Sequence, residues 1–174
     1  MEFCLIGIDI GTTATKATLI DATGQQLAHF ERPHSTIRTA PGMAEQRPED
    51  WLEGVFGALG HFSGAVDPSR IIGIGLTSQV NSHVFADARG EALRPAITWQ
   101  DTRAAEDAAL LDRQVTAEQK TAWFGGPVPI DASHALSRMA FVARTAPEDW
   151  VETRYVLLPK DYVALKLTGA VASD

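Results

Sequence analysis

Apolar and polar positions fall into blocks along this chain, and the early blocks predict β-strands. Apolar runs at 3–8, 14–20 and 26–32 have the length and residue types of strands. Gly11-Thr12-Thr13 predicts a tight turn between the first two strands. The next stretch, 33–47, contains two prolines, a glycine and several polar residues, so it predicts a long surface loop.

Helical spacing begins at Pro48, where a proline and two acids suit a first turn, and it fades at Gly60 and Gly64. The same criteria predict later strands at 71–76, 84–86, 93–98 and 156–158. They predict later helices at 104–113, 116–123, from 133 or 134 to 145, and at 159–167. Three early strands followed by mixed strands and helices predict an α/β domain.

The first twenty-one residues combine groups that could bind a magnesium-bound polyphosphate. Asp9 at the end of the first strand could hold a hard cation, directly or through water. The N–H groups and hydroxyls of the Gly/Thr turn could surround phosphate oxygens, and Lys16 could offset their charge. The alternative is an ordinary hairpin with a solvated carboxylate. A helix-based nucleotide loop is excluded, because G-x-x-x-x-G-K-[ST] is missing and the turn leads into a strand.

Two polar groups directly follow predicted strands, where ligands gather in open α/β sheets. They are Gln79/Asn81/His83 and Trp99/Asp101/Arg103. Amides, a carboxylate and a guanidinium suit sugar hydroxyls, which both donate and accept hydrogen bonds, and an indole could cover an apolar face. The alternative for Asp101 and Arg103 is a solvated pair that caps the next helix.

Composition narrows the classes of function. The net charge of −7 over 174 residues argues against a nucleic-acid-binding surface. The single cysteine, Cys4, excludes an internal disulfide and a cysteine-based metal site, and the five histidines lack metal-ligand spacing. No eighteen-residue apolar run exists, so we expect a soluble, cytoplasmic protein without membrane contact.

Several segments, in order, carry a family resemblance. They are DIGTTATK at 9–16, AEQRPEDW at 44–51, IGLTSQVNSHVFAD at 74–87, LRPAITWQDTRA at 93–104 and LLPKDYVALKLTGAVASD at 157–174. Together they resemble the N-terminal part of the FGGY family of carbohydrate kinases, and within it the xylulose kinases. The resemblance implies an actin-like (ribonuclease-H-like) domain with a mixed sheet flanked by helices. In that family two such domains enclose the active site between them.

The resemblance also implies roles for individual residues. Asp9 would be the metal-site carboxylate for Mg²⁺. Gly11, Thr12, Thr13 and Lys16 would lie near the transferred phosphate of ATP. The positions implied for the sugar site are Gln79, Val80, Asn81, Trp99, Asp101 and Arg103. Xylulose kinases carry methionine and histidine where this chain has Val80 and Asn81, which puts D-xylulose itself in doubt but still suits a ketose or polyol.

The family's usual catalytic base is an aspartate beyond residue 174, and its second, nucleotide-binding domain also lies beyond this sequence. We therefore expect a fragment that is incomplete at its C-terminal end and inactive alone, with ATP and a sugar or polyol as partners of the whole kinase. The sequence leaves the oligomeric state open, with a homodimer as one alternative. Alternatives are a non-catalytic sugar-binding module and an actin-like chaperone, filament protein or ATPase that shares the hairpin.

Overall fold

The computed structural model describes residues 3–173, which form two compact units. The first unit contains residues 3–36, 46–80 and 157–173, and the second contains residues 37–45 and 81–156. Each unit buries its own set of apolar side chains.

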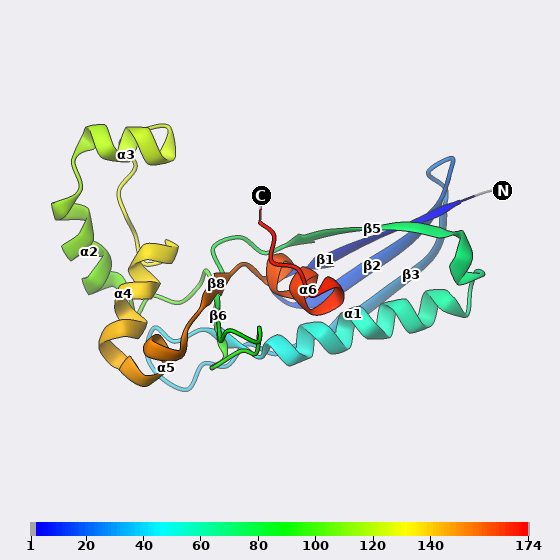
Figure 1. Ribbon diagram of the computed structural model, residues 1–174, viewed down its shortest axis with the longest axis horizontal. Coiled ribbons are helices and arrows are strands. Elements are labelled where there is room, and N and C mark those ends of the chain that lie inside the picture. The colour runs from blue at the N-terminus through cyan, green and yellow to red at the C-terminus, as the bar shows by residue number, and fades with distance from the viewer. Residues whose placement is uncertain (1–2, 174) are drawn as a thin grey trace. The chain divides into compact units, whose positions relative to one another are not determined.

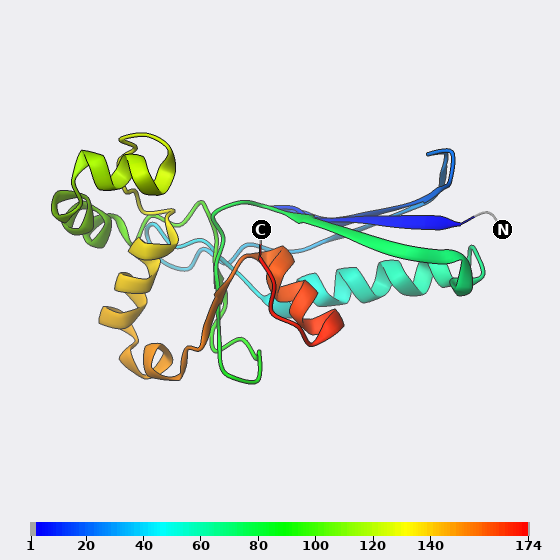
Figure 2. The ribbon, with the colours of Figure 1, turned by 45° about the horizontal axis from the view of Figure 1, so that its top comes forward.

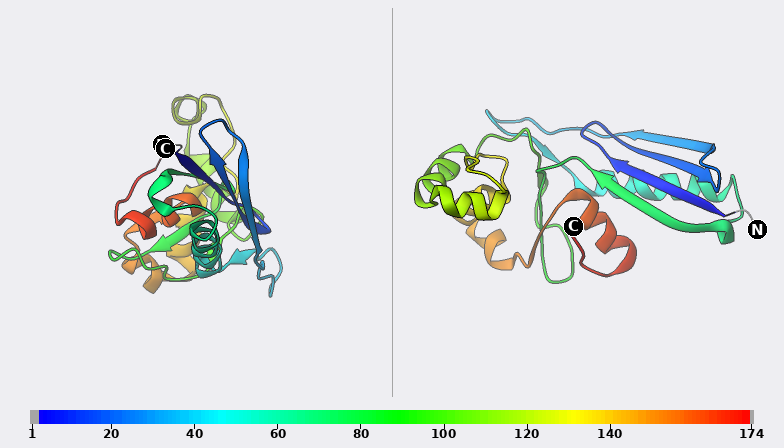
Figure 3. Two further views of the ribbon diagram at one scale, coloured as in Figure 1. Left: turned by 90° about the vertical axis from the view of Figure 1, so that its right-hand side faces the viewer. Right: turned by 90° about the horizontal axis from the view of Figure 1, so that it is seen from above.

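The first unit is built on a four-stranded sheet with the strand order β3-β2-β1-β5 (Figure 1 and Figure 3). Its strands are β1 (Cys4–Ile10), β2 (Ala14–Asp21), β3 (Gln26–Pro33) and β5 (Ile71–Ser78). β2 runs antiparallel to both β1 and β3, whereas β1 and β5 are parallel. The sheet is therefore mixed, which confirms the predicted fold class.

One face of this sheet is covered by helices. The helices are α1 (Pro48–Ser63) and α6 (Pro159–Thr168), and both lie on the same side (Figure 2). The 3₁₀-helix η1 (Pro68–Arg70) leads into β5. Side chains of a strand alternate between faces, so every second residue of β1 is buried against the helices. The core of the unit includes Ile6, Ile8, Ile10, Leu19, Trp51, Val55, Phe62, Tyr162 and Val163.

The opposite face carries the other residues of β1, which include Leu5, Gly7 and Asp9. Leu5 is 37% exposed, because no helix in the described part of this unit lies on that side. The uncovered face is where polar groups of the central strands can meet a ligand.

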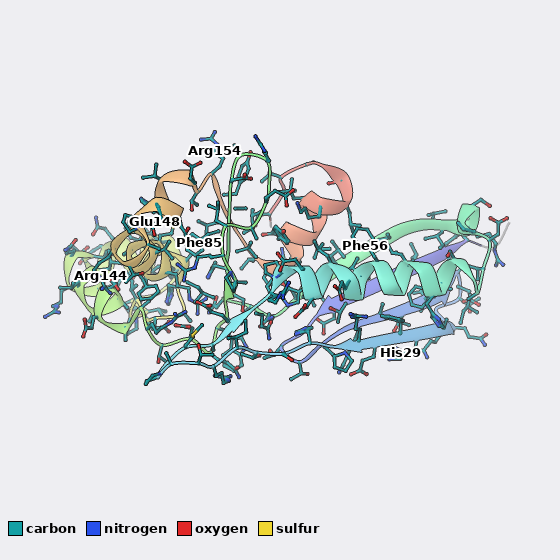
Figure 4. All side chains as sticks on the ribbon, turned by 90° about the horizontal axis from the view of Figure 1, so that it is seen from below. His29, Phe56, Phe85, Arg144, Glu148 and Arg154 are labelled. Atoms are coloured by element: carbon teal, nitrogen blue, oxygen red, sulfur yellow. The ribbon has the colours of Figure 1, made fainter. Side chains whose placement is uncertain are left out.

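The second unit is mainly helical. Its helices are α2 (Ala105–Gln114), α3 (Ala117–Phe124), α4 (Ala135–Thr145) and α5 (Pro147–Glu152). There are also two short strand pairs. β4 (Glu45–Gln46) pairs with β7 (Ala96–Ile97), and β6 (Val84–Ala86) pairs with β8 (Tyr155–Leu157). Phe85 of β6, which is labelled in Figure 4, belongs to a buried cluster that includes two residues of α4, Phe141 and Val142.

Several predicted boundaries are wrong. β1 continues to Ile10, so Asp9 lies within the strand rather than after it. The predicted strand at 93–98 is limited to Ala96–Ile97, and the predicted loop at 33–47 ends in β4. Helix α5 was not predicted. These elements are too short for a periodic signal, and β4 and β7 depend on pairing with residues far away in the chain.

Among the described residues, no helix combines the length and apolar character that crossing a membrane requires.

Candidate functional site

Asp9 lies near the C-terminal end of β1, directly across from Lys16 on β2 and Thr77 on β5. Residues opposite each other in neighbouring strands point to the same side of a sheet, so the three side chains share the uncovered face. A hollow of about 560 Å³ opens there, and its lining includes Asp9, Lys16, Thr77, Thr18 and His29. The structure thus brings the predicted carboxylate and the predicted lysine to one hollow.

The turn after β1 is compact. The N–H of Gly11 donates to the carbonyl oxygen of Ala14 at 3.0 Å, which closes the hairpin. A Cβ atom at position 11 would lie 3.0 Å from that same oxygen, which is closer than ordinary van der Waals contact. Glycine therefore suits position 11 because a side chain would crowd the closing hydrogen bond.

All three carbonyl groups of the turn are held by the protein. The carbonyl oxygens of Gly11, Thr12 and Thr13 accept hydrogen bonds from Gln79 Nε2 (3.3 Å), Gln46 Nε2 (2.7 Å) and the His34 N–H (3.0 Å). In a trans peptide the C=O and N–H groups point in opposite directions. Bonds from the protein to the Gly11 and Thr12 carbonyls therefore aim the N–H groups of Thr12 and Thr13 away from these donors, as a phosphate cradle requires.

Gln46 is the centre of this support, and its side chain is 1% exposed. Its Nε2 also donates to Thr36 Oγ1 at 2.9 Å, while its Oε1 accepts from Trp51 Nε1 (3.1 Å) and Gln79 Nε2 (2.7 Å). Every hydrogen-bonding position of the amide is thereby used. Gln46 carries no sequence signal for the site, because the turn and Gln79, which it supports, lie more than thirty residues away in the chain.

Gln79, predicted to contact the sugar, is placed differently from the other predicted sugar residues. Its side chain is 8% exposed, and its amide bonds with the turn and with Gln46. In this structure Gln79 supports the β1–β2 turn from inside the first unit. The neighbouring Val80 is 70% exposed.

In the second unit, Asp101 is almost completely buried, with 2% exposure. Its Oδ2 accepts the N–H of Ala44 at 2.8 Å and pairs with Arg103 Nη2 at 2.8 Å. Oδ1 accepts the backbone N–H of Arg103 at 3.0 Å. The alternative of a solvated pair is therefore wrong for the carboxylate: Asp101 is a buried anion that orders the turn before α2.

Arg103 joins two carboxylates, because its Nη2 also reaches Glu45 Oε1 at 2.5 Å. Its guanidinium carbon lies 5.2 Å from the centre of the Phe141 ring. Partial burial opposes the charged form, but the hydrogen bonds that Arg103 donates to Asp101 and Glu45 outweigh this effect and raise the pKa of Arg103. Arg103 therefore fixes Asp101 in place as a permanent cation.

A second hollow, of about 320 Å³, lies beside Asp101 within the same unit. It is lined by Trp99, Asp101, Thr102, Asp131, Ala132 and Ser133. Trp99 is 46% exposed, so its ring can cover a bound group. Asp131 and Ser133 were not predicted: they precede a helix as ordinary turn residues and carry no sequence signal for binding.

Asn81 is connected to this hollow through Ser133. Its Nδ2 donates to Ser133 Oγ at 3.1 Å, and Ser133 Oγ in turn donates to Asp131 Oδ1 at 2.7 Å. The backbone of Asn81 has φ +51, a left-handed conformation that asparagine tolerates better than most residues. The structure therefore groups Asn81, Trp99 and Asp101 around this hollow, whereas the guanidinium of Arg103 bonds with Asp101 and Glu45 and does not line it.

The predicted site residues are thus divided between the units. Those in the first unit are Asp9, Gly11, Thr12, Thr13, Lys16, Gln79 and Val80, and those in the second are Asn81, Trp99, Asp101 and Arg103. One group is a charged hollow beside a supported turn, and the other is a polar hollow with an exposed indole.

Comparison with known proteins identifies the family. Residues 4–174 match the sequence profile of the N-terminal domain of the FGGY family of carbohydrate kinases. The chain belongs to this family. A xylulose kinase from Klebsiella pneumoniae is 34% identical over 170 residues, which cover 97% of this chain and 34% of that protein.

Solved structures of the FGGY family agree with this fold. A xylulose kinase from Rhodospirillum rubrum superposes with a TM-score of 0.87 at 29% identity, over 95% of this chain and 34% of that one. A gluconate kinase from Lactobacillus acidophilus has a TM-score of 0.88 at 25% identity, over 98% and 34%. The chain has the actin-like, ribonuclease-H-like fold and spans about a third of the length of these relatives.

Proposed function

We propose that these residues are the acceptor-binding, N-terminal domain of an ATP-dependent carbohydrate kinase. The nucleotide-binding domain would lie in the remaining length seen in the relatives. The reaction would transfer the γ-phosphoryl group of Mg-ATP to a hydroxyl of a ketose or polyol. The observation that carries this proposal is the charged hollow of Asp9 and Lys16 beside a turn whose three carbonyls are held by the protein.

The phosphate end of the site would be formed by the β1–β2 hairpin. Thr12 and Thr13 would present N–H and hydroxyl groups to phosphate oxygens, and Lys16 would offset their charge. The described residues contain no group of three histidine, cysteine, aspartate or glutamate side chains that could hold a metal. A single carboxylate, Asp9, nevertheless fits Mg²⁺, which commonly takes one or two protein carboxylates together with substrate phosphates. The bound ion would neutralise charge on the phosphoryl oxygens.

The acceptor would lie in the second hollow. Asp101 and Asp131 can accept hydrogen bonds from hydroxyls, and Trp99 can cover an apolar face of the carbon chain. Asn81, linked to this group through Ser133, would read a further hydroxyl. Arg103 would act indirectly by holding Asp101.

The acceptor class is supported by the relatives, which are named xylulose kinase and gluconate kinase. All of these names denote kinases of short polyhydroxylated molecules. The family resemblance puts Val80 and Asn81 at the positions where xylulose kinases carry methionine and histidine, so the proposal covers ketoses and polyols rather than D-xylulose alone. The proton of the accepting hydroxyl would pass to an aspartate beyond residue 174, at the family's usual position for the base.

The test is an ADP-release assay on a full-length kinase chain, in which these residues continue through the length of the relatives. At least one ketose or polyol in a panel should give sugar-dependent turnover in the range of about 1–100 s⁻¹. ADP release that no sugar changes would favour an actin-like ATPase instead. Sugar binding in calorimetry without ADP release would favour a non-catalytic binding module.

A further inference from the structure

Arg138 of α4 has a completely buried side chain, with 0% exposure. No carboxylate of the described residues forms an ion pair with it. Its guanidinium instead donates to backbone carbonyl oxygens: Nη1 to those of Asn81 and Ile97 (3.1 Å to Ile97), and Nη2 to that of Thr98 (2.5 Å). A buried cation surrounded by carbonyls is costly, because each carbonyl supplies only a partial charge.

These three carbonyls come from the two segments that carry the proposed acceptor residues. One belongs to Asn81 itself, in its left-handed backbone conformation. The other two belong to Ile97 and Thr98, and Thr98 directly precedes Trp99. One guanidinium therefore hydrogen-bonds with both segments, because its rigid, planar set of donors can reach several acceptors at once.

His83 completes the cluster. Its Nδ1 lies 2.9 Å from Arg138 Nη1, and its backbone pairs with that of Ile97 through two hydrogen bonds. Burial, together with the charges of Arg138 and His134, lowers the pKa of His83 to about 3, so the ring is neutral at physiological pH. A neutral Nδ1 can accept from the guanidinium, which leaves Arg138 oriented toward the carbonyls.

Stability alone does not account for this arrangement. Burial lowers the pKa of Arg138 to about 10, which reflects the cost of removing the cation from water. An apolar side chain of similar size could fill the space without that cost. The contacts of Arg138 instead coincide with the two segments whose relative placement decides the shape of the acceptor site.

We propose that Arg138 is a positioning residue for the acceptor site, which holds the Asn81 segment and the Ile97–Asp101 segment in register through their backbone carbonyls. The proposal rests on the proposed kinase function. It concerns acceptor recognition only, because none of the contacts of Arg138 reaches the phosphate hairpin.

The test compares Arg138→Lys and Arg138→Met with the wild type in the full-length kinase. Lysine keeps the charge and folds into the same space, but one ammonium cannot reach three carbonyls with the geometry of a fork. We expect Arg138→Lys to raise the KM for sugar by about tenfold and Arg138→Met by about a hundredfold, with the KM for ATP within about twofold of wild type. Arg144→Met is the matched control on the same helix, because Arg144 has an exposed side chain; it should leave both KM values unchanged.

Hydrogen exchange gives a second readout that does not depend on catalysis. In Arg138→Lys, amide protection should fall at residues 81–83 and 97–101 and stay unchanged in the β1–β2 hairpin. An unchanged sugar KM, or equal losses for sugar and ATP, would overturn the positioning role, and so would unchanged protection at both segments. A wild-type kinase without sugar-dependent turnover would instead refute the proposed function, and the exchange result would still decide whether Arg138 orders these segments.

Discussion

Asp9→Asn in the full-length kinase should lower kcat by about 10²–10³-fold and leave the fold unchanged. The substitution keeps the size of the side chain but removes the negative charge that would hold the metal beside the phosphates. Asp9 makes no side-chain hydrogen bond or ion pair with another described residue, so the free energy of unfolding should change by less than about 0.5 kcal/mol.

Steady-state kinetics at saturating sugar and ATP measure this effect, and thermal unfolding measures the stability. The matched control is Asp67→Asn, an exposed aspartate of the same unit that bonds only with its own turn. It should have wild-type kcat. Near-normal turnover of Asp9→Asn would show that the metal and phosphates bind elsewhere.

Asp101→Ala should have the largest effect on stability, a loss of about 3 kcal/mol in the free energy of unfolding. The variant leaves Arg103 without one of its two carboxylates and leaves the buried Ala44 N–H without its acceptor. This loss lies near the lower end of the range expected when a buried ion pair is broken, because Arg103 still pairs with Glu45. Chemical denaturation measures it.

Glu53→Ala provides the control for Asp101→Ala. Glu53 pairs with Arg32, and both side chains are about half exposed, so its removal should cost less than about 1 kcal/mol. Equal losses in the two variants would contradict the buried role of Asp101.

Asn81→Gly is the cleaner probe of the acceptor site, because a loss of sugar affinity in Asp101→Ala would combine lost stability with lost sugar contacts. The substitution removes the amide, and glycine tolerates the positive φ at this position. The apparent affinity for sugar should fall, while the apparent affinity for ATP should stay unchanged.

The parts of the fold that could be predicted are those determined by local patterns. The β1–β2 hairpin follows from two apolar runs around Gly11-Thr12-Thr13, and α1 follows from its apolar spacing between Pro48 and Gly64. β4, β7 and α5 could not be predicted, because two to six residues contain too little periodicity to compete with the pattern of a loop.

The candidate site was predictable in its residue types but not in their partners. A polar residue after a strand is typical of a ligand contact, yet the amide of Gln79 bonds with Gln46, thirty-three residues away. Asp101 and Arg103 form the expected pair, but burial by Glu45 and Phe141 is visible only in three dimensions. Arg138 lies in a sequence typical of an amphipathic helix, where an arginine usually faces water.

The central proposal is that these residues supply the acceptor site and one phosphate turn of a kinase. The most direct measurement compares sugar-dependent ADP release by the purified 174-residue chain and by the full-length kinase, with the same panel of ketoses and polyols. We expect turnover only from the full-length chain. Loss of the base should lower the rate by a factor of about 10²–10⁴, and loss of the second domain should remove the positioning of ATP as well. Sugar-dependent turnover of about one per second or faster from the 174 residues by themselves would contradict the account.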